Sequence, residues 1–207
     1  SRGLGDVYKR PVLGIWVMSP TVLMTRSHAV RVVPDLQGMK VRISSPVESQ
    51  LIQSWGAVPV AMPITESYNA LNSGVVDAVL IQPSALYQPW NLAEPAQFVT
   101  INVPSPTSIV GLIMNKASWE ALPADQQAAL DSLTGCDFSI QASILWSRKD
   151  VDALAKARTD EGITVIDLPD QEREAFDAAA QTAISAHLDQ LEKEGIHARD
   201  IYQAFKR

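Results

Sequence analysis

Three short apolar runs alternate with two helical patterns between residues 34 and 84, and this rhythm is the feature that most constrains the fold. The alternating runs and helical patterns cover residues 40–43, 48–55, 58–62, 65–73 and 75–81. Short β-branched runs between turn residues are typical of strands, whereas apolar residues spaced three or four apart are typical of helices. The segment therefore predicts a β-α-β-α-β unit and an α/β fold.

Arg42 lies at the end of the first of these strands. Alternate side chains of a strand point to opposite faces, so Lys40 and Arg42 share one face while Val41 and Ile43 share the other. Ligands of open α/β sheets bind outside the carboxyl ends of strands, and a guanidinium there can pair with both oxygens of a carboxylate. Arg42 is therefore a candidate ligand-binding residue; the alternative is an ordinary surface arginine on a polar strand face.

The rest of the chain predicts further strands and long helices. Strands are expected at residues 12–17, 22–25, 97–103, 108–115 and 163–168. Residues 124–161 contain no proline and one glycine, Gly135, and predict one long helix with a bend near that glycine. Such a helix would reach about 50 Å, more than the diameter of a small domain, so we expect it to join two lobes. A final helix is expected after Pro169.

The composition argues against several classes of protein. The 207-residue chain has a formal net charge of −6 and no cluster of Lys and Arg, so nucleic acid is not an expected partner. No segment is apolar over the roughly 20 residues that a membrane span needs, so direct membrane insertion is not expected either. The chain starts at Ser1 without an initiator methionine or a signal peptide, which favours a processed or truncated start.

The sequence gives no sign of a metal or another cofactor. Cys136 is the single cysteine, and its neighbours Leu133 and Phe138 predict a buried structural thiol. The three histidines lie in unrelated elements and lack the spacing of metal ligands. No glycine-rich phosphate loop and no nucleophile elbow occur. We therefore expect no cofactor.

Several ordered motifs resemble one known family. In the first half they are Asp35-Leu36-Gln37-Gly38-Met39-Lys40-Val41-Arg42, Trp55-Gly56-Ala57-Val58-Pro59-Val60, Glu66-Ser67-Tyr68-Asn69-Ala70-Leu71 and Gly74-Val75-Val76-Asp77. In the second half they include Trp119-Glu120-Ala121-Leu122-Pro123 and Gly162-Ile163-Thr164-Val165. Together they resemble the solute-binding proteins of tripartite ATP-independent periplasmic (TRAP) transporters.

This resemblance implies a two-lobed α/β fold of the periplasmic binding protein type, similar to type II. One lobe is expected to be largely complete and to consist of residues 20–106 and 163–207. The other is expected to be a remnant, formed by residues 1–19 and 107–162 together with the long connecting helix. Family members have a longer amino-terminal half, so the chain resembles a truncated member.

The apolar run at residues 108–115 allows a check of this expectation. It has almost no polar face, which is typical of a strand covered on both sides. If its covering elements are missing, Ile109, Leu112 and Ile113 should be exposed and should form an aggregation-prone edge.

The resemblance also implies a ligand site. Arg42 stands where the family forms a two-pronged salt bridge with the carboxylate of the ligand. Gln82 follows the third strand near a position where relatives carry an asparagine, but it is one residue farther from Asp77 and could equally be a turn residue before Pro83. Ile64 stands where relatives often have an aromatic ring, and the alternative for it is a plain core contact. The expected binding residues are Arg42, Gln82, Ile64 and Pro83.

The resemblance implies a protein that captures a small organic acid in the periplasm and delivers it to the membrane subunits of a TRAP transporter, without catalysis. One alternative is a small α/β enzyme in which Arg42 holds a carboxylated metabolite and Asp77 or Glu66 acts as acid or base. The residues themselves favour structural roles for both acids, because Asp77 begins a strand and Glu66 suits the first turn of a helix. A third hypothesis is a lobe that binds no ligand.

Overall fold

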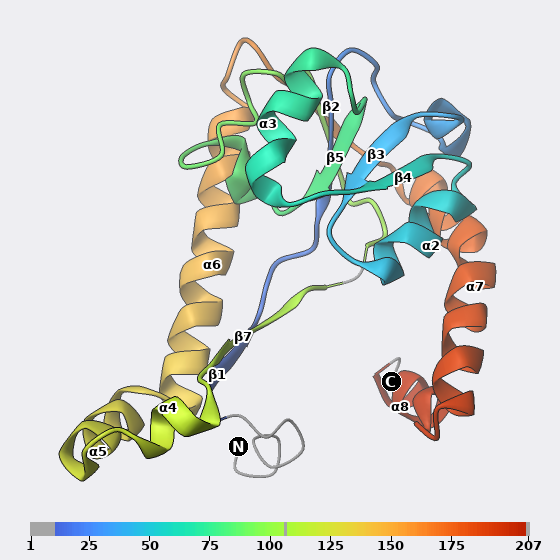
Figure 1. Cartoon of the computed structure of the whole chain (residues 1–207). Helices are drawn as coiled ribbons and strands as arrows, with labels where there is room; N and C mark the ends of the chain where they lie inside the picture. The colour runs from blue at the N-terminus through green and yellow to red at the C-terminus, as the bar shows by residue number, and fades with distance from the viewer. Residues whose placement is uncertain (1–10, 106, 206–207) are drawn as a thin grey trace. The chain divides into compact units, whose positions relative to one another are not determined.

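The computed structural model describes residues 11–105 and 107–205 and is shown in Figure 1. The chain divides into two compact units. Unit 1 consists of residues 1–20 and 107–152, and unit 2 consists of residues 21–106 and 153–207. Each unit has its own sheet, with two strands in unit 1 and six in unit 2 among the residues described. The mixed α/β character expected from the sequence is confirmed.

Unit 2 is built on a sheet with the strand order β4-β3-β5-β2-β6-β8. These strands are β2 (Val22–Thr25), β3 (Lys40–Ile43), β4 (Val58–Ala61), β5 (Ala78–Ile81), β6 (Phe98–Ile101) and β8 (Thr164–Asp167). Strand β3 is parallel to β4 and β5, β6 is parallel to β8, and β2 runs antiparallel to both of its neighbours. All strands except β2 therefore end at one edge of the sheet, the carboxyl edge.

Helices cover both faces of this sheet, with a separate apolar core on each. On one face, Val41 and Ile43 of β3 pack with α2 (Pro46–Ser54) and α7 (Asp170–Lys193), which lie side by side in Figure 1. The centre of this core is Trp55, which is 1% exposed, packs edge-to-face on Phe176 and donates from Nε1 to the Phe176 carbonyl at 3.1 Å. On the other face, α3 (Ile64–Ser73) packs through Leu71 on β2 and β5.

Several boundaries differ from the expected ones because turn residues decide them. Helix α3 begins directly after Pro63, so Thr65, which has the side chain of a typical cap, lies inside the first turn. Gly74 ends α3 with a φ of 77°, a left-handed conformation that glycine adopts without strain. The chain then turns through residues 75–77, so β5 starts at Ala78.

The segment predicted as one long helix consists of two. Helix α5 (Ala124–Leu133) is followed by α6 (Cys136–Ala157), which begins in unit 1 and ends in unit 2. Gly135 separates them with a φ of 92°, and its N–H donates to the Leu13 carbonyl at 2.7 Å, away from the helical ladder. The prediction of a mainly helical segment is confirmed, and the prediction of a single bent helix is wrong.

Cys136 is also placed differently from the expected position. It is exposed, because it opens α6 immediately after the break, and neighbouring Leu133 is 72% exposed as well. The prediction of a buried structural thiol is therefore wrong.

The remaining described helices are short or lie near the carboxyl terminus. They are η1 (Val33–Leu36), η2 (Pro83–Leu86), α4 (Lys116–Glu120) and α8 (Ala198–Phe205). Segment η2 follows β5 directly, so it lies at the carboxyl edge of the unit 2 sheet.

Unit 1 is built on β1 (Val12–Val17) paired antiparallel with β7 (Ile109–Ile113). Helix α6 satisfies the outer edge of β1, because the hydroxyl oxygens of Ser139 and Ser143 accept hydrogen bonds from the N–H groups of Ile15 and Val17 at 3.0 and 3.3 Å. Within the described chain, the outer edge of β7 pairs with no strand.

The apolar side chains of β7 are exposed, as the sequence analysis expected. The exposed fractions are 73% for Ile109, 41% for Leu112 and 50% for Ile113. The strand carries no charge, proline or bulge on its free edge, which are the features that normally prevent edge-to-edge association.

Ile109→Lys is expected to reduce self-association of the 207-residue chain, because it places a charge on this unpaired apolar edge. Sedimentation velocity at several concentrations measures the effect. Val75→Lys is the matched control, since Val75 is also exposed, at 56%, but lies in a turn of unit 2. Equal reduction by both substitutions would show that added charge, and not the β7 edge, controls association.

Candidate functional site

Arg42 is buried at the carboxyl edge of the unit 2 sheet, with 4% of its surface exposed. It is in register with Val60 of β4 and Val79 of β5, so its side chain leaves the sheet on the α3 face between two apolar neighbours. The predicted alternation of faces along β3 is confirmed. The alternative of a surface arginine on a polar face is wrong, because the adjoining strands make this face apolar.

The guanidinium of Arg42 has few partners within the protein. Its Nε donates to the Met62 carbonyl, just after β4, at 3.1 Å. Among the residues described, no carboxylate forms an ion pair with it, and no hydrogen bond is found for its two terminal nitrogens. Burial lowers the pKa of Arg42, and the charge of Glu48 opposes this shift. A buried cation without an ion-pair partner is costly, so these terminal nitrogens are candidates for binding an anion.

Glu48 shapes the turn that follows Arg42. It is 2% exposed, and its Oε2 accepts from the N–H and hydroxyl of Ser44 at 2.6 and 2.9 Å and from the N–H of Ser45 at 3.1 Å. The Ser45 hydroxyl in turn accepts from the Glu48 N–H at 3.3 Å, which completes a capping box at the start of α2. Glu48 was not among the predicted site residues, although the Ser-x-x-Glu pattern at residues 45–48, soon after Arg42, is a signal for this arrangement.

The other predicted site residues lie in segments that follow the neighbouring strands. Ile64 is half-buried and opens α3 after β4. Gln82, half-buried, and Pro83, buried, follow β5 and begin η2. Because β3, β4 and β5 are parallel neighbours, the structure brings all four predicted residues to the same edge.

Contacts with the end of α6 hold the segment after β5 in place. The ammonium of Lys156 lies 3.7 Å from the centre of the Tyr87 ring, and the Tyr87 hydroxyl donates to Asp160 Oδ2 at 3.3 Å. Burial, followed by the Asp160 charge, raises the pKa of Tyr87 to about 12, so the phenol is neutral at ordinary pH. These contacts restrict the loop that carries Gln82 and Pro83.

The two acids considered for catalysis do not join Arg42. Asp77 precedes β5, at the opposite edge of the sheet, where its Oδ2 accepts from the Lys40 N–H at 2.8 Å. Its own N–H donates to the Lys40 carbonyl, also at 2.8 Å. Glu66 is exposed in the first turn of α3. Asp77 is therefore a structural turn residue, and the geometry gives no acid–base pair beside Arg42.

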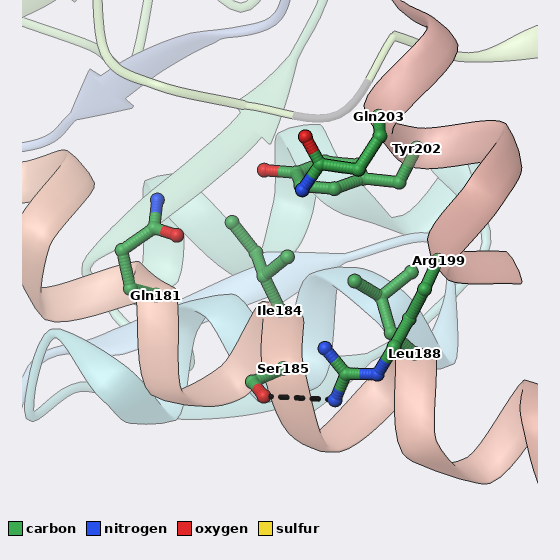
Figure 2. A pocket seen from close by; sticks show the side chains of 7 residues that line it. All are labelled: Gln181, Ile184, Ser185, Leu188, Arg199, Tyr202 and Gln203. Carbon is green, nitrogen blue, oxygen red and sulfur yellow. Dashed lines mark hydrogen bonds between the residues drawn. The ribbon is translucent and has the colours of Figure 1, made fainter. Parts of the chain in front are cut away.

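A second arginine lines a hollow of about 250 Å³ between α7 and α8, shown in Figure 2. The hollow is lined by Gln181, Ile184, Ser185, Leu188, Arg199, Tyr202 and Gln203. Arg199 is bound within the protein, because its Nη2 donates to Asp189 and, at 3.3 Å, to the Ser185 hydroxyl. Since Asp189 already neutralises this guanidinium, the hollow is a poorer candidate for a carboxylate site than the edge at Arg42.

Two further features are absent from the part of the chain that the structure describes. No group of three or more His, Cys, Asp or Glu side chains there could hold a metal ion. None of the helices there has the length and apolar character needed to cross a membrane.

The chain belongs to the bacterial extracellular solute-binding protein family 7 (DctP), whose profile matches residues 9–191. A relative is the C4-dicarboxylate-binding periplasmic protein DctP of Rhodobacter capsulatus, which is 33% identical over 112 residues, or 53% of this chain and 32% of that protein. Another is the outer membrane transporter protein TsaT of Comamonas testosteroni, 30% identical over 138 residues, or 66% of this chain and 40% of that protein.

Solved structures share the fold. The crystal structure of a TRAP periplasmic solute-binding protein from Bordetella bronchiseptica, with bound (R)- and (S)-mandelate, is similar with a TM-score of 0.80 at 25% identity. The match covers 92% of this chain and 60% of that one. The chain thus matches 32–60% of the length of these relatives, less than two thirds of each.

Proposed function

We propose that this chain is the ligand-binding part of a TRAP-type extracytoplasmic solute-binding protein that captures a small organic acid through Arg42. The observation that carries the proposal is an arginine, 4% exposed as a residue, at the carboxyl edge and without an ion-pair partner among the described residues. Family membership supports a transport role, since the matching profile is that of extracellular solute-binding proteins. The mandelates bound by the Bordetella protein and the C4-dicarboxylates named for DctP all carry carboxylates.

The contact from Nε to Met62 favours one geometry of binding. With Nε occupied by a backbone carbonyl, Nη1 and Nη2 form the end of the guanidinium that can meet the two carboxylate oxygens. Ile64 and Pro83 would supply apolar contacts, and Gln82 would supply an uncharged hydrogen-bonding group. In this proposal unit 2 is the ligand-binding lobe, and an ion pair with Arg42 is strengthened where water is excluded from it.

The proposed setting follows from the family. The protein would act in the periplasm and hand its ligand to the membrane subunits of a TRAP transporter. It would bind without catalysis, because the acids considered for an enzyme, Asp77 and Glu66, are a structural turn residue and an exposed helix residue.

A thermal-shift screen of the chain with carboxylic acids tests this function. Each acid is compared with the alcohol or amide of the same skeleton, for example benzoate with benzyl alcohol and benzamide. We expect some acids, and none of their neutral analogues, to raise the melting temperature, because a ligand that binds the native state stabilises it. Proton NMR of the acids after incubation should show them unchanged.

Two results would contradict the proposal. If no acid shifted the melting temperature, the chain would not be a carboxylate-binding protein. Chemical conversion of an acid by the chain, lost in Arg42→Lys, would instead support the enzyme hypothesis.

A further inference from the structure

Arg42 is the last cationic side chain for a long stretch of the sequence. From residue 43 to residue 115 there is no Lys, Arg or His, whereas the same stretch contains the four acids Glu48, Glu66, Asp77 and Glu94. This stretch includes β4, β5, η2, β6 and every segment that follows β3, β4 and β5 at the carboxyl edge. These segments therefore offer a ligand one positive charge.

Glu48 offsets part of that charge from within the protein. It is buried like Arg42, and its Oε2 accepts three hydrogen bonds from Ser44 and Ser45, which form the turn after β3. A carboxylate held in this way acts through a medium that screens charge weakly. Its charge reaches the guanidinium, since it is the group that opposes the effect of burial on the Arg42 pKa.

Glu66 adds a second negative charge near the same edge. It lies in the first turn of α3, two residues after Ile64, and is exposed, so solvent screens it more than Glu48. Once a first ligand carboxylate has neutralised Arg42, a second one would meet two negative charges and no cation supplied by these segments. The Lys156 ammonium, from α6, contacts the Tyr87 ring after η2, and Asp160, which accepts from the Tyr87 hydroxyl, adds a negative charge at the same tyrosine.

We propose that Glu48 is a specificity-determining residue that makes the Arg42 edge select ligands with a single carboxylate over dicarboxylates. The inference rests on the proposed function and adds the ligand class to it. The first carboxylate pairs with Arg42, and a second one is rejected by the buried charge of Glu48, which is selection by repulsion. The uncharged remainder of the ligand faces Ile64, Gln82 and Pro83, none of which could neutralise a second carboxylate.

Matched pairs of acids test this proposal by calorimetry. Butyrate and succinate have the same four-carbon skeleton and differ by one carboxylate, as do benzoate and terephthalate on a benzene ring. For the pair whose monoacid binds, we expect the unmodified chain to prefer the monoacid by at least about tenfold. Glu48→Gln should reduce this preference at least about threefold, because the amide keeps the size and a carbonyl acceptor for Ser44 and Ser45 but removes the charge.

Two control variants separate charge from structure. Ser44→Ala removes one hydrogen bond to Glu48 and no charge, so the preference should remain. Glu66→Gln removes an exposed charge at the same edge and should change the preference less than Glu48→Gln.

The outcomes distinguish the two proposals. Monoacid binding with equal or tighter diacid binding by the unmodified chain would overturn the selectivity, and so would an unchanged preference in a folded Glu48→Gln variant. If that variant does not fold, the preference of the unmodified chain still decides the ligand class. If no acid binds at all, the proposed function fails and the selectivity fails with it.

Discussion

Arg42→Lys is expected to weaken carboxylate binding by about 2–4 kcal/mol and to leave the fold intact. Lysine carries its charge at one point and cannot donate to the Met62 carbonyl while also spanning two carboxylate oxygens. Calorimetry with the acid that gives the largest thermal shift measures the loss, and circular dichroism verifies the fold.

The control for this substitution is Arg26→Lys. Arg26 is exposed and follows β2 at the opposite edge of the same sheet, so its replacement should leave the affinity unchanged. Arg42→Met adds a second comparison, because a neutral side chain of similar length should abolish binding without lowering stability. Equal affinities of the unmodified chain and Arg42→Lys would show that Arg42 does not bind the ligand.

Trp55→Ala is expected to cause the largest loss of stability of the substitutions considered, about 3–5 kcal/mol. The indole lies at the centre of the core formed by α2 and α7, is 1% exposed and packs edge-to-face on Phe176 at a centroid distance of 5.2 Å. Its removal leaves a cavity and takes the Nε1 donor away from the Phe176 carbonyl. Urea unfolding monitored by circular dichroism measures the change.

Two further variants provide comparisons for the stability loss of Trp55→Ala. Trp55→Phe keeps most of the ring volume and loses the hydrogen bond, so it should lie between Trp55→Ala and the unmodified chain. Trp119→Ala should cost less, because Trp119 is only half-buried in unit 1. A loss below about 1 kcal/mol for Trp55→Ala would show that this core does not limit stability.

The periodicity of the sequence was sufficient to predict most elements of unit 2. Apolar alternation and glycine or proline turns identified β3, β4 and β5 and the helices between them, because these signals are local. Helix starts were less predictable. Thr65 has the side chain of a typical cap, but the extended conformation of Pro63 starts α3 earlier.

The break at Gly135 shows a different limit of prediction from the sequence. A single glycine is tolerated in many helices, so the local pattern could not distinguish a bend from a complete break. The hydrogen bond from Gly135 to Leu13, distant in sequence, is part of the arrangement that ends α5 there, and no local pattern reveals it.

The candidate site was predictable in position but not in environment. Strand alternation predicted the correct face for Arg42. Its burial, however, depends on Val60 and Val79, which lie beside it only because β4 and β5 pair with β3. The buried charge of Glu48 likewise depends on the conformation of the turn after β3. The environment of the guanidinium is therefore a tertiary property.

A crystal structure of the chain with the acid that raises its melting temperature most is the most direct test of the central claim. We predict that the two carboxylate oxygens lie within hydrogen-bonding distance of Arg42 Nη1 and Nη2, while Nε stays on the Met62 carbonyl. A ligand bound in the hollow beside Arg199, with no acid at Arg42, would contradict the claim.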